Sequence, residues 1–120
     1  MVLISSSAAL TGLPNHEAIA AAKAGVIGLT RSAAASYAGS RLRFNAVAPG
    51  LVKTKLTEQL WSNETVGSGS VAMHALGRLG EPEDVASMVA WLLDPSNDWV
   101  TGQVIGIDGG LAHVRGRTKR

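Results

Sequence analysis

The sequence contains no cysteine, few prolines and few aromatic residues. Without cysteine the chain cannot form a disulfide framework, a thiolate metal site or a thiol nucleophile. No apolar run reaches the roughly 20 residues that span a bilayer. The first residues also lack the basic and long apolar segments of a secretion signal. We therefore expect a cytoplasmic protein that does not associate with membranes.

Charge is also scarce, and it is unevenly distributed. Charged residues make up 17% of the 120-residue chain and apolar residues 46%, a balance typical of one folded domain with a buried core. Residues 114–120 carry four of the eleven lysines and arginines and no acidic residue. No aromatic residue interleaves with this basic run, so we expect no nucleic-acid partner. His74 and His113 have no partner at metal-binding spacing, so we expect no metal site either.

Short apolar segments rich in β-branched residues predict three strands, at 2–4, 43–47 and 103–108. Two long helices are predicted at 17–37, which is rich in alanine, and at 82–93, which begins at a proline. Strands and helices alternate along the chain, and the strands are apolar on both faces. This pattern indicates an α/β fold in which a parallel sheet is flanked by helices.

The stretch between the second strand and the second long helix has weaker signals. Thr54 is predicted to cap a short helix that ends near Leu60. Residues 61–80 are expected to be irregular, with a short helical piece near 71–75. Gly67-Ser68-Gly69-Ser70 are expected to form a mobile loop, because glycine and serine favour flexible segments. No polar pattern in this stretch is diagnostic of a particular substrate.

Several segments follow one another in the order of a known family pattern. They are Ile4-Ser5-Ser6, Ala20-Ala21-Ala22-Lys23-Ala24-Gly25-Val26, the run from Arg43 to Thr54, the run from Gly77 to Ala86, and the run from Thr101 to Gly110. Together they resemble the C-terminal half of the short-chain dehydrogenase/reductase (SDR) family. The resemblance implies a partial Rossmann-type doubly wound parallel sheet, with its last three strands in residues 1–110 and a basic flexible tail at 111–120. The first of these strands would then be an open apolar edge.

The resemblance also implies an NAD(P)-dependent oxidoreductase that transfers hydride between a nicotinamide cofactor and a carbonyl or alcohol. In this family a serine, a tyrosine and a lysine four residues after the tyrosine serve the reaction. Ser6 and Lys23 match the serine and the lysine, but Ile19 stands at the tyrosine position. A phenol beside an ammonium group exchanges a proton with the substrate oxygen, whereas isoleucine has no ionisable atom. We therefore expect the isolated chain to be inactive.

Other interpretations of these residues stay open. His16, seven residues before Lys23, titrates near neutral pH in general and is a candidate proton donor. An exposed or capping histidine is the plainer interpretation of His16. Ser6 can equally hydrogen-bond the backbone locally, and Lys23 can be an ordinary surface lysine.

The resemblance places the cofactor, NAD or NADP, against Lys23 and the 49–54 loop. Lys23 would hold the ribose hydroxyls, while Pro49, Gly50, Val52 and Thr54 would hold the nicotinamide carboxamide. The alternative for this loop is a turn followed by a capped helix. Pyrophosphate usually binds a glycine-rich turn at a helix N-terminus, and no such turn occurs in this sequence. Dinucleotide binding by this chain alone is therefore not expected.

Two further functions compete with a truncated or atypical oxidoreductase. A non-catalytic SDR-like interaction module would use the open sheet edge to pair with another chain. A pseudoenzyme remnant would have no activity at all. The apolar edge and the alanine-rich helix predict a homo-oligomer or pairing with an SDR subunit.

Overall fold

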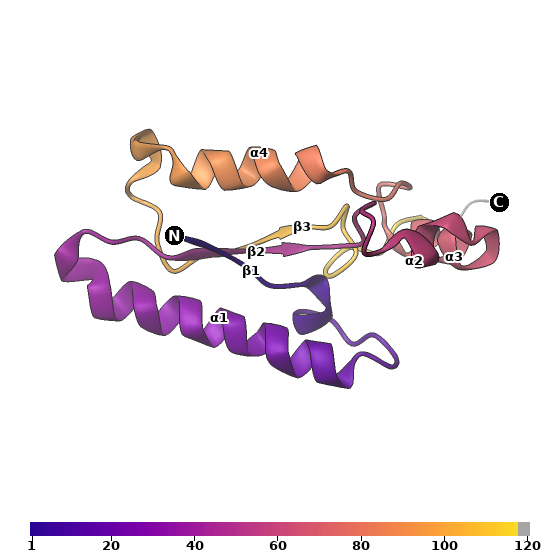
Figure 1. The fold of residues 1–120 in the computed structure, drawn as a ribbon, viewed down its shortest axis with the longest axis horizontal. Coiled ribbons are helices and arrows are strands. Elements are labelled where there is room, and N and C mark those ends of the chain that lie inside the picture. Colours follow the sequence, from indigo (N-terminus) through magenta and orange to yellow (C-terminus); the bar gives the residue numbers. More distant parts are fainter. Residues whose placement is uncertain (118–120) are drawn as a thin grey trace.

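Three parallel strands lie between two long helices in the computed structural model, which describes residues 1–117 (Figure 1). The strands are β1 (Val2–Ile4), β2 (Asn45–Pro49) and β3 (Val104–Ile107). β2 pairs with both neighbours, so the sheet order is β1-β2-β3 and every pair is parallel. The predicted α/β class with a parallel sheet is confirmed. Because the strands are parallel, their carboxyl ends meet at one edge of the sheet.

Helices cover both faces of this sheet. They are α1 (Glu17–Tyr37), α2 (Glu58–Ser62), α3 (Glu64–Met73) and α4 (Pro82–Leu93), with short 3-10 turns η1 (Ser7–Ala9), η2 (Ala38–Ser40) and η3 (Pro95–Asn97). Figure 1 shows α1 against one face and α4 against the other, while α2 and α3 lie beyond the carboxyl ends of the strands. Both long helices have the bounds predicted from the sequence. At the start of α4 the Glu81 N–H donates to Asp84 Oδ2 at 2.7 Å, which satisfies an amide at the helix start.

The stretch predicted to be irregular is helical over α3, so that prediction is wrong. Gly67-Ser68-Gly69-Ser70 lie inside this helix rather than in a mobile loop. The Asn63 side chain caps the helix by accepting a backbone N–H at 3.1 Å. A Cβ at Gly67 would lie 2.8 Å from the Trp61 carbonyl oxygen, so the missing side chain lets α2 and α3 meet. This close contact and the cap outweigh the poor helix propensity of glycine.

Thr54 does not cap a helix, which corrects a second prediction. α2 begins at Glu58, and Thr57 is the residue that precedes it. The Thr54 hydroxyl lies 3.1 Å from the Thr57 hydroxyl, and Thr57 Oγ1 accepts the Thr54 N–H at 3.0 Å. These bonds hold the residues between the two threonines in a turn, so the helix starts after that turn.

The buried core centres on β2 and on the inner face of α4. Ala46, Val47 and Ala48 have no exposed surface, and Leu92 is 1% exposed. β1 and β3 are only partly covered, and Ile4 keeps 46% of its surface exposed. Among the described residues β1 pairs with β2 alone, so its other edge is open.

Residues 111–117 follow β3 as a turn and a short segment without regular structure. The last three residues of the predicted basic tail, 118–120, lie outside the described residues. Within 1–117 no helix is long and apolar enough to cross a membrane. Nor does this part of the chain bring three His, Cys, Asp or Glu side chains together as a metal site would require.

Leu92→Ala is expected to destabilise the fold by about 2–5 kcal/mol, because it leaves a cavity in the core under α4. Urea unfolding followed by circular dichroism measures this free energy. Leu93→Ala is the matched control, since Leu93 belongs to the same helix but is 54% exposed. The Leu93→Ala substitution should lower the free energy of unfolding by less than about 1 kcal/mol. Equal losses in the two variants would contradict the buried position of Leu92.

Candidate functional site

Three consecutive serines follow β1, and each has a different role. Ser5 is buried and its Oγ donates to the Lys23 carbonyl oxygen at 2.8 Å, which fixes α1 against the end of β1. Ser7 is also buried, and its Oγ donates to Asp108 Oδ2 at 3.1 Å. Ser6 lies between them, half-buried, and its Oγ accepts the Ala8 N–H at 3.1 Å. The Ser6 hydroxyl thus keeps its own proton available for donation.

Lys23 lies next to this end of β1. Its Nζ donates to the Ile4 carbonyl oxygen at 3.1 Å. An ammonium group has three donors, so two are left for other acceptors. The bond positions the Lys23 ammonium beside the residues that immediately precede Ser6.

A cavity of about 450 Å³ opens at the same edge of the sheet. Of the predicted site residues, those that line it are Ser6, His16, Ile19, Pro49 and Gly50. Much of the remaining wall is apolar, with side chains from α2, α3 and the C-terminal turn. Among the residues that the structure describes, Lys23, Val52 and Thr54 are not part of this wall. The structure therefore brings the predicted serine, isoleucine and proline-glycine turn together, and leaves the lysine outside the cavity.

His16 precedes α1 but does not cap it, because its side chain makes no capping hydrogen bond. Its Nδ1 lies 2.7 Å from the Pro14 carbonyl oxygen. A carbonyl oxygen only accepts, so Nδ1 carries a proton in this contact and Nε2 is the nitrogen left for a ligand. The turn that brings the two groups together has Asn15 at φ 61°, a left-handed conformation that asparagine tolerates better than most residues.

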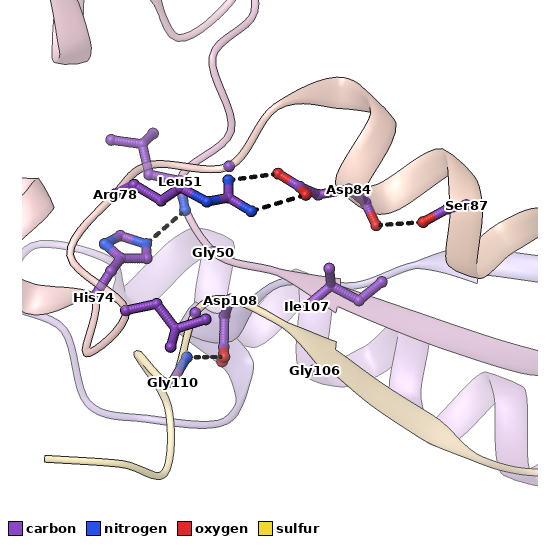
Figure 2. Close-up of a pocket in the computed structure, with 13 residues that line it drawn as sticks. Gly50, Leu51, His74, Arg78, Asp84, Ser87, Gly106, Ile107, Asp108 and Gly110 are labelled. Atoms are coloured by element: carbon purple, nitrogen blue, oxygen red, sulfur yellow. Dashed lines mark hydrogen bonds and ion pairs between the residues drawn. The ribbon is translucent and has the colours of Figure 1, made fainter. Parts of the chain in front are cut away.

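His74 is a structural residue that the sequence analysis missed. It is buried, its Nδ1 donates to the Ser70 carbonyl oxygen at 2.6 Å, and its Nε2 accepts the Leu51 N–H at 3.1 Å (Figure 2). A Cβ at Gly50 would lie 2.7 Å from that Nε2, so only glycine leaves room for the ring. This histidine ties α3 to the 49–54 loop. Nothing in the sequence pattern around His74 indicates this contact.

The 49–54 loop is held on several sides. The Gly50 N–H donates to the Ile107 carbonyl oxygen at 3.0 Å, and the Lys53 N–H donates to the Gly80 carbonyl oxygen at 2.9 Å. Within residues 1–117 the Val52 N–H has no hydrogen-bond acceptor. The loop thus presents one unpaired amide between two anchored neighbours.

Figure 2 shows Arg78 paired with Asp84, and Asp108 bonded to Gly110. The Arg78 guanidinium contacts both carboxylate oxygens of Asp84, at 2.8 and 3.0 Å. The Arg78 hydrogen bonds, and then the Glu81 N–H, lower the pKa of Asp84 to about 2. The same carboxylate raises the pKa of Arg78. Asp108 accepts the Gly110 N–H at 2.9 Å and the Ala112 N–H at 3.1 Å, so it holds the turn after β3.

This chain is similar to known proteins that are more than twice its length. A family model described as Enoyl-(Acyl carrier protein) reductase matches residues 1–112. The chain is 45% identical over 111 residues to the 3-oxoacyl-[acyl-carrier-protein] reductase FabG of Thermotoga maritima, and the match covers 92% of this chain and 44% of that protein. It is 42% identical over 109 residues to a cyclohexanol dehydrogenase of an Acinetobacter species, covering 91% of this chain and 41% of that protein. The chain thus spans less than half the length of these curated relatives.

Solved structures share the fold. A short-chain type dehydrogenase/reductase from Mycobacterium ulcerans superposes with a TM-score of 0.90 at 37% identity, covering 96% of this chain and 42% of that one. ElxO with NADP bound superposes with a TM-score of 0.84 at 37% identity, covering 92% of this chain and 45% of that one. The arrangement of strands and helices described above is therefore part of larger solved proteins, one of which holds NADP.

We expect the Arg78–Asp84 ion pair to make the free energy of unfolding depend on pH. The pKa of Asp84 is about 2 in the folded chain, below the value of about 3.9 expected when the chain is unfolded. The contribution is therefore complete above about pH 5 and is lost as the pH falls from about 4 towards 2. We expect Asp84→Asn to destabilise the chain at neutral pH and to approach the wild type near pH 2. Urea unfolding at a series of pH values measures the difference.

Arg78→Gln is the companion variant, because it removes the guanidinium that lowers the pKa of Asp84. It should reduce the same pH-dependent contribution without removing the carboxylate. If the free energies of unfolding of wild type and Asp84→Asn differ by the same amount at every pH down to 2, the ion pair is not the cause of the difference.

Proposed function

The chain belongs to the short-chain dehydrogenase/reductase family, and on this premise we propose that it forms the C-terminal half of an NAD(P)-dependent oxidoreductase. The proposed reaction is hydride transfer between a nicotinamide cofactor and a carbonyl or alcohol substrate. The observation that carries the proposal is that Ser6, Ile19 and the Pro49-Gly50 turn line one cavity at the carboxyl ends of β1 and β2. Ligands of open α/β sheets bind outside this edge of the sheet.

The residues at this edge suit the nicotinamide end of the cofactor, which supplies or accepts the hydride when it is bound. The Lys23 ammonium has two donors beyond its bond to Ile4, and these suit the ribose hydroxyls. The Val52 N–H, unpaired within residues 1–117, suits the carboxamide oxygen. The Thr54 hydroxyl follows two residues later, but it is hydrogen-bonded to the Thr57 hydroxyl at 3.1 Å, so a cofactor would have to compete for it. No glycine-rich turn precedes a helix in this chain, so the pyrophosphate lacks its usual cradle.

Proton transfer is the step that this chain is least equipped to perform. Ile19 stands where the family has a tyrosine, and an aliphatic side chain can neither give nor take a proton. Loss of a positioned acid or base costs about 10²–10⁴ in rate. Two histidines line the cavity, but both nitrogens of His74 are engaged with backbone groups. His16 Nε2 is therefore the proposed alternative carrier, and without it the chain is a pseudoenzyme.

A non-catalytic interaction module is the second candidate function. The open edge of β1 supports it, because a strand with unpaired backbone groups pairs readily with another chain. The proposed partner is a second copy of this chain or an intact SDR subunit. A cytoplasmic location remains part of the proposal.

Self-association through the β1 edge is expected to give a dimer or a larger species in size-exclusion chromatography with light scattering. Ile4→Lys should shift the chain towards monomer, because a charge on an edge strand opposes pairing. Leu56→Lys is the control, since Leu56 is 94% exposed and lies in the turn before α2 rather than on β1 or α1. A folded monomeric wild type, or equal effects of the two variants, would contradict pairing through this edge.

The catalytic proposal is tested by a fusion in which this chain replaces the matched 44% of the Thermotoga maritima relative. We expect the fused protein to reduce that relative's substrate about 10²–10⁴-fold more slowly than its Ile19→Tyr variant, because the tyrosine restores a proton donor. Steady-state kinetics give the ratio, and fluorescence titration confirms that both forms bind the dinucleotide.

Ala18→Tyr is the control, because it adds a phenol at the neighbouring position that does not line the cavity. It should leave the rate unchanged. His16→Gln on the Ile19 background tests the alternative carrier, since loss of the residual rate would assign the proton to the imidazole. If the Ile19→Tyr protein binds the dinucleotide and is no faster than the parent, the proton argument is wrong.

A further inference from the structure

A second and larger cavity adjoins the one that holds Ser6. It has a volume of about 710 Å³ and lies between residues 11–13, α3 and the C-terminal segment. We call it the C-terminal cleft, and its lining includes Leu13, Val71, Met73, Leu111, Val114, Arg115 and Arg117. Leu13, Met73, His74 and Leu111 line both cavities. The cleft and the cavity of Ser6 and Ile19 are therefore neighbours with a common wall.

The C-terminal segment is seated in this position by close backbone contacts. The Val114 N–H donates to the Gly110 carbonyl oxygen at 2.9 Å, which closes a turn after β3. A Cβ at Gly116 would lie 3.3 Å from the Ala75 Cα, so the chain passes directly over the residues that follow α3. Figure 1 shows this end of the chain running beside α2 and α3. The two arginines that flank Gly116 are thus presented at the cleft by a segment packed against the body of the chain.

Charge in the cleft has one sign. Arg115 and Arg117 line it, and no aspartate or glutamate does. Within residues 1–117 the ion pairs are Lys53–Glu81 and Arg78–Asp84, so neither of these arginines is paired with a carboxylate there. A guanidinium group binds carboxylates through two parallel hydrogen bonds. The arginines provide a site for an anionic group.

The wall beside these arginines is apolar and open. Met73 is 49% exposed and Val114 is 58% exposed, although both line the cleft. Exposed apolar side chains next to unpaired cations suit a ligand with an alkyl chain and an anionic end. A purely polar anion would leave this wall uncovered, and an uncharged hydrocarbon would leave the arginines without a partner.

We propose that the C-terminal cleft binds an aliphatic carboxylate, with the carboxylate at Arg115 and Arg117 and the alkyl chain along Met73 and Val114. The alkyl chain would then extend past Met73, which lines both cavities, in the direction of Ser6. Resting on the proposed function, this names the substrate class as aliphatic carbonyl or hydroxy compounds that carry an anionic group at the far end. The binding itself requires neither cofactor nor turnover.

The test is a calorimetric titration of the 120-residue chain with decanoate in the absence of any dinucleotide. We expect saturable binding that weakens about tenfold or more in the Arg115→Gln/Arg117→Gln double variant, because charge-assisted hydrogen bonds are lost. Arg31→Gln is the matched control, since Arg31 is an exposed arginine of α1 outside the cleft. This variant should bind decanoate with the same affinity as wild type. Met73→Gln should also weaken binding, because it makes the apolar wall polar.

Two probes separate the parts of the ligand. Decanol keeps the alkyl chain without the charge, and acetate keeps the charge without the chain, so each should bind more weakly than decanoate. Decyl phosphate in place of decanoate distinguishes a carboxylate site from a phosphate site, and tighter binding of the phosphate would overturn the carboxylate assignment.

Several results would overturn the proposal. Equal decanoate affinities for wild type and the double arginine variant would remove the anion site. A change of oligomeric state in that variant, measured by light scattering, with no decanoate binding by wild type would assign the cleft to contact between copies. Decanoate binding together with an inactive Ile19→Tyr fusion would retain the cleft and refute the proposed oxidoreductase function, so the two failures are distinguishable.

Discussion

Parallel pairing on both sides of β2 is the constraint on which the rest of the molecule depends. Parallel neighbours must be joined by crossovers, and here α1 makes one crossover and the segment with α4 makes the other. The crossovers cover opposite faces of the sheet, so β2 is buried on both sides and is built from small residues such as Ala46 and Ala48. All loops that follow strands then collect at one edge. Ser6, the 49–54 loop and Asp108 meet there for this reason.

At that edge, most polar groups hold the structure and few are left for a ligand. Ser5 and Ser7 are used to anchor α1 and Asp108, and His74 is used to anchor the 49–54 loop. Each of these side chains is buried, and a buried polar group without a partner costs about 1–3 kcal/mol. The half-buried Ser6 and the exposed His16 are under no such requirement. Together with the half-buried Ser70, they are polar side chains that the cavity can offer to a substrate.

The apolar character of the cavity is consistent with both proposals. Ile19 contributes an aliphatic side chain to the wall, which favours aliphatic groups, and several wall residues are shared with the C-terminal cleft. In the proposed reaction such a cavity would bind and orient the substrate, and His16 would be the source of the proton. The two proposals thus assign binding and proton transfer to different side chains.

The parallel α/β sheet, the bounds of α1 and α4, and the position of Ser6 after β1 could all be predicted from the amino-acid sequence. These features depend on hydrophobic periodicity, helix propensity and local order along the chain, which neighbouring residues decide among themselves. The helical conformation of residues 67–70, the pairing of Thr54 with Thr57 and the hydrogen bond between His74 and Leu51 are visible only in the folded chain. The folded chain also shows that Lys23 lies outside the cavity and that Arg115 and Arg117 line a cleft. Those features depend on contacts between segments far apart in sequence, or on atomic fits as tight as Gly67 against Trp61, and no local pattern encodes them.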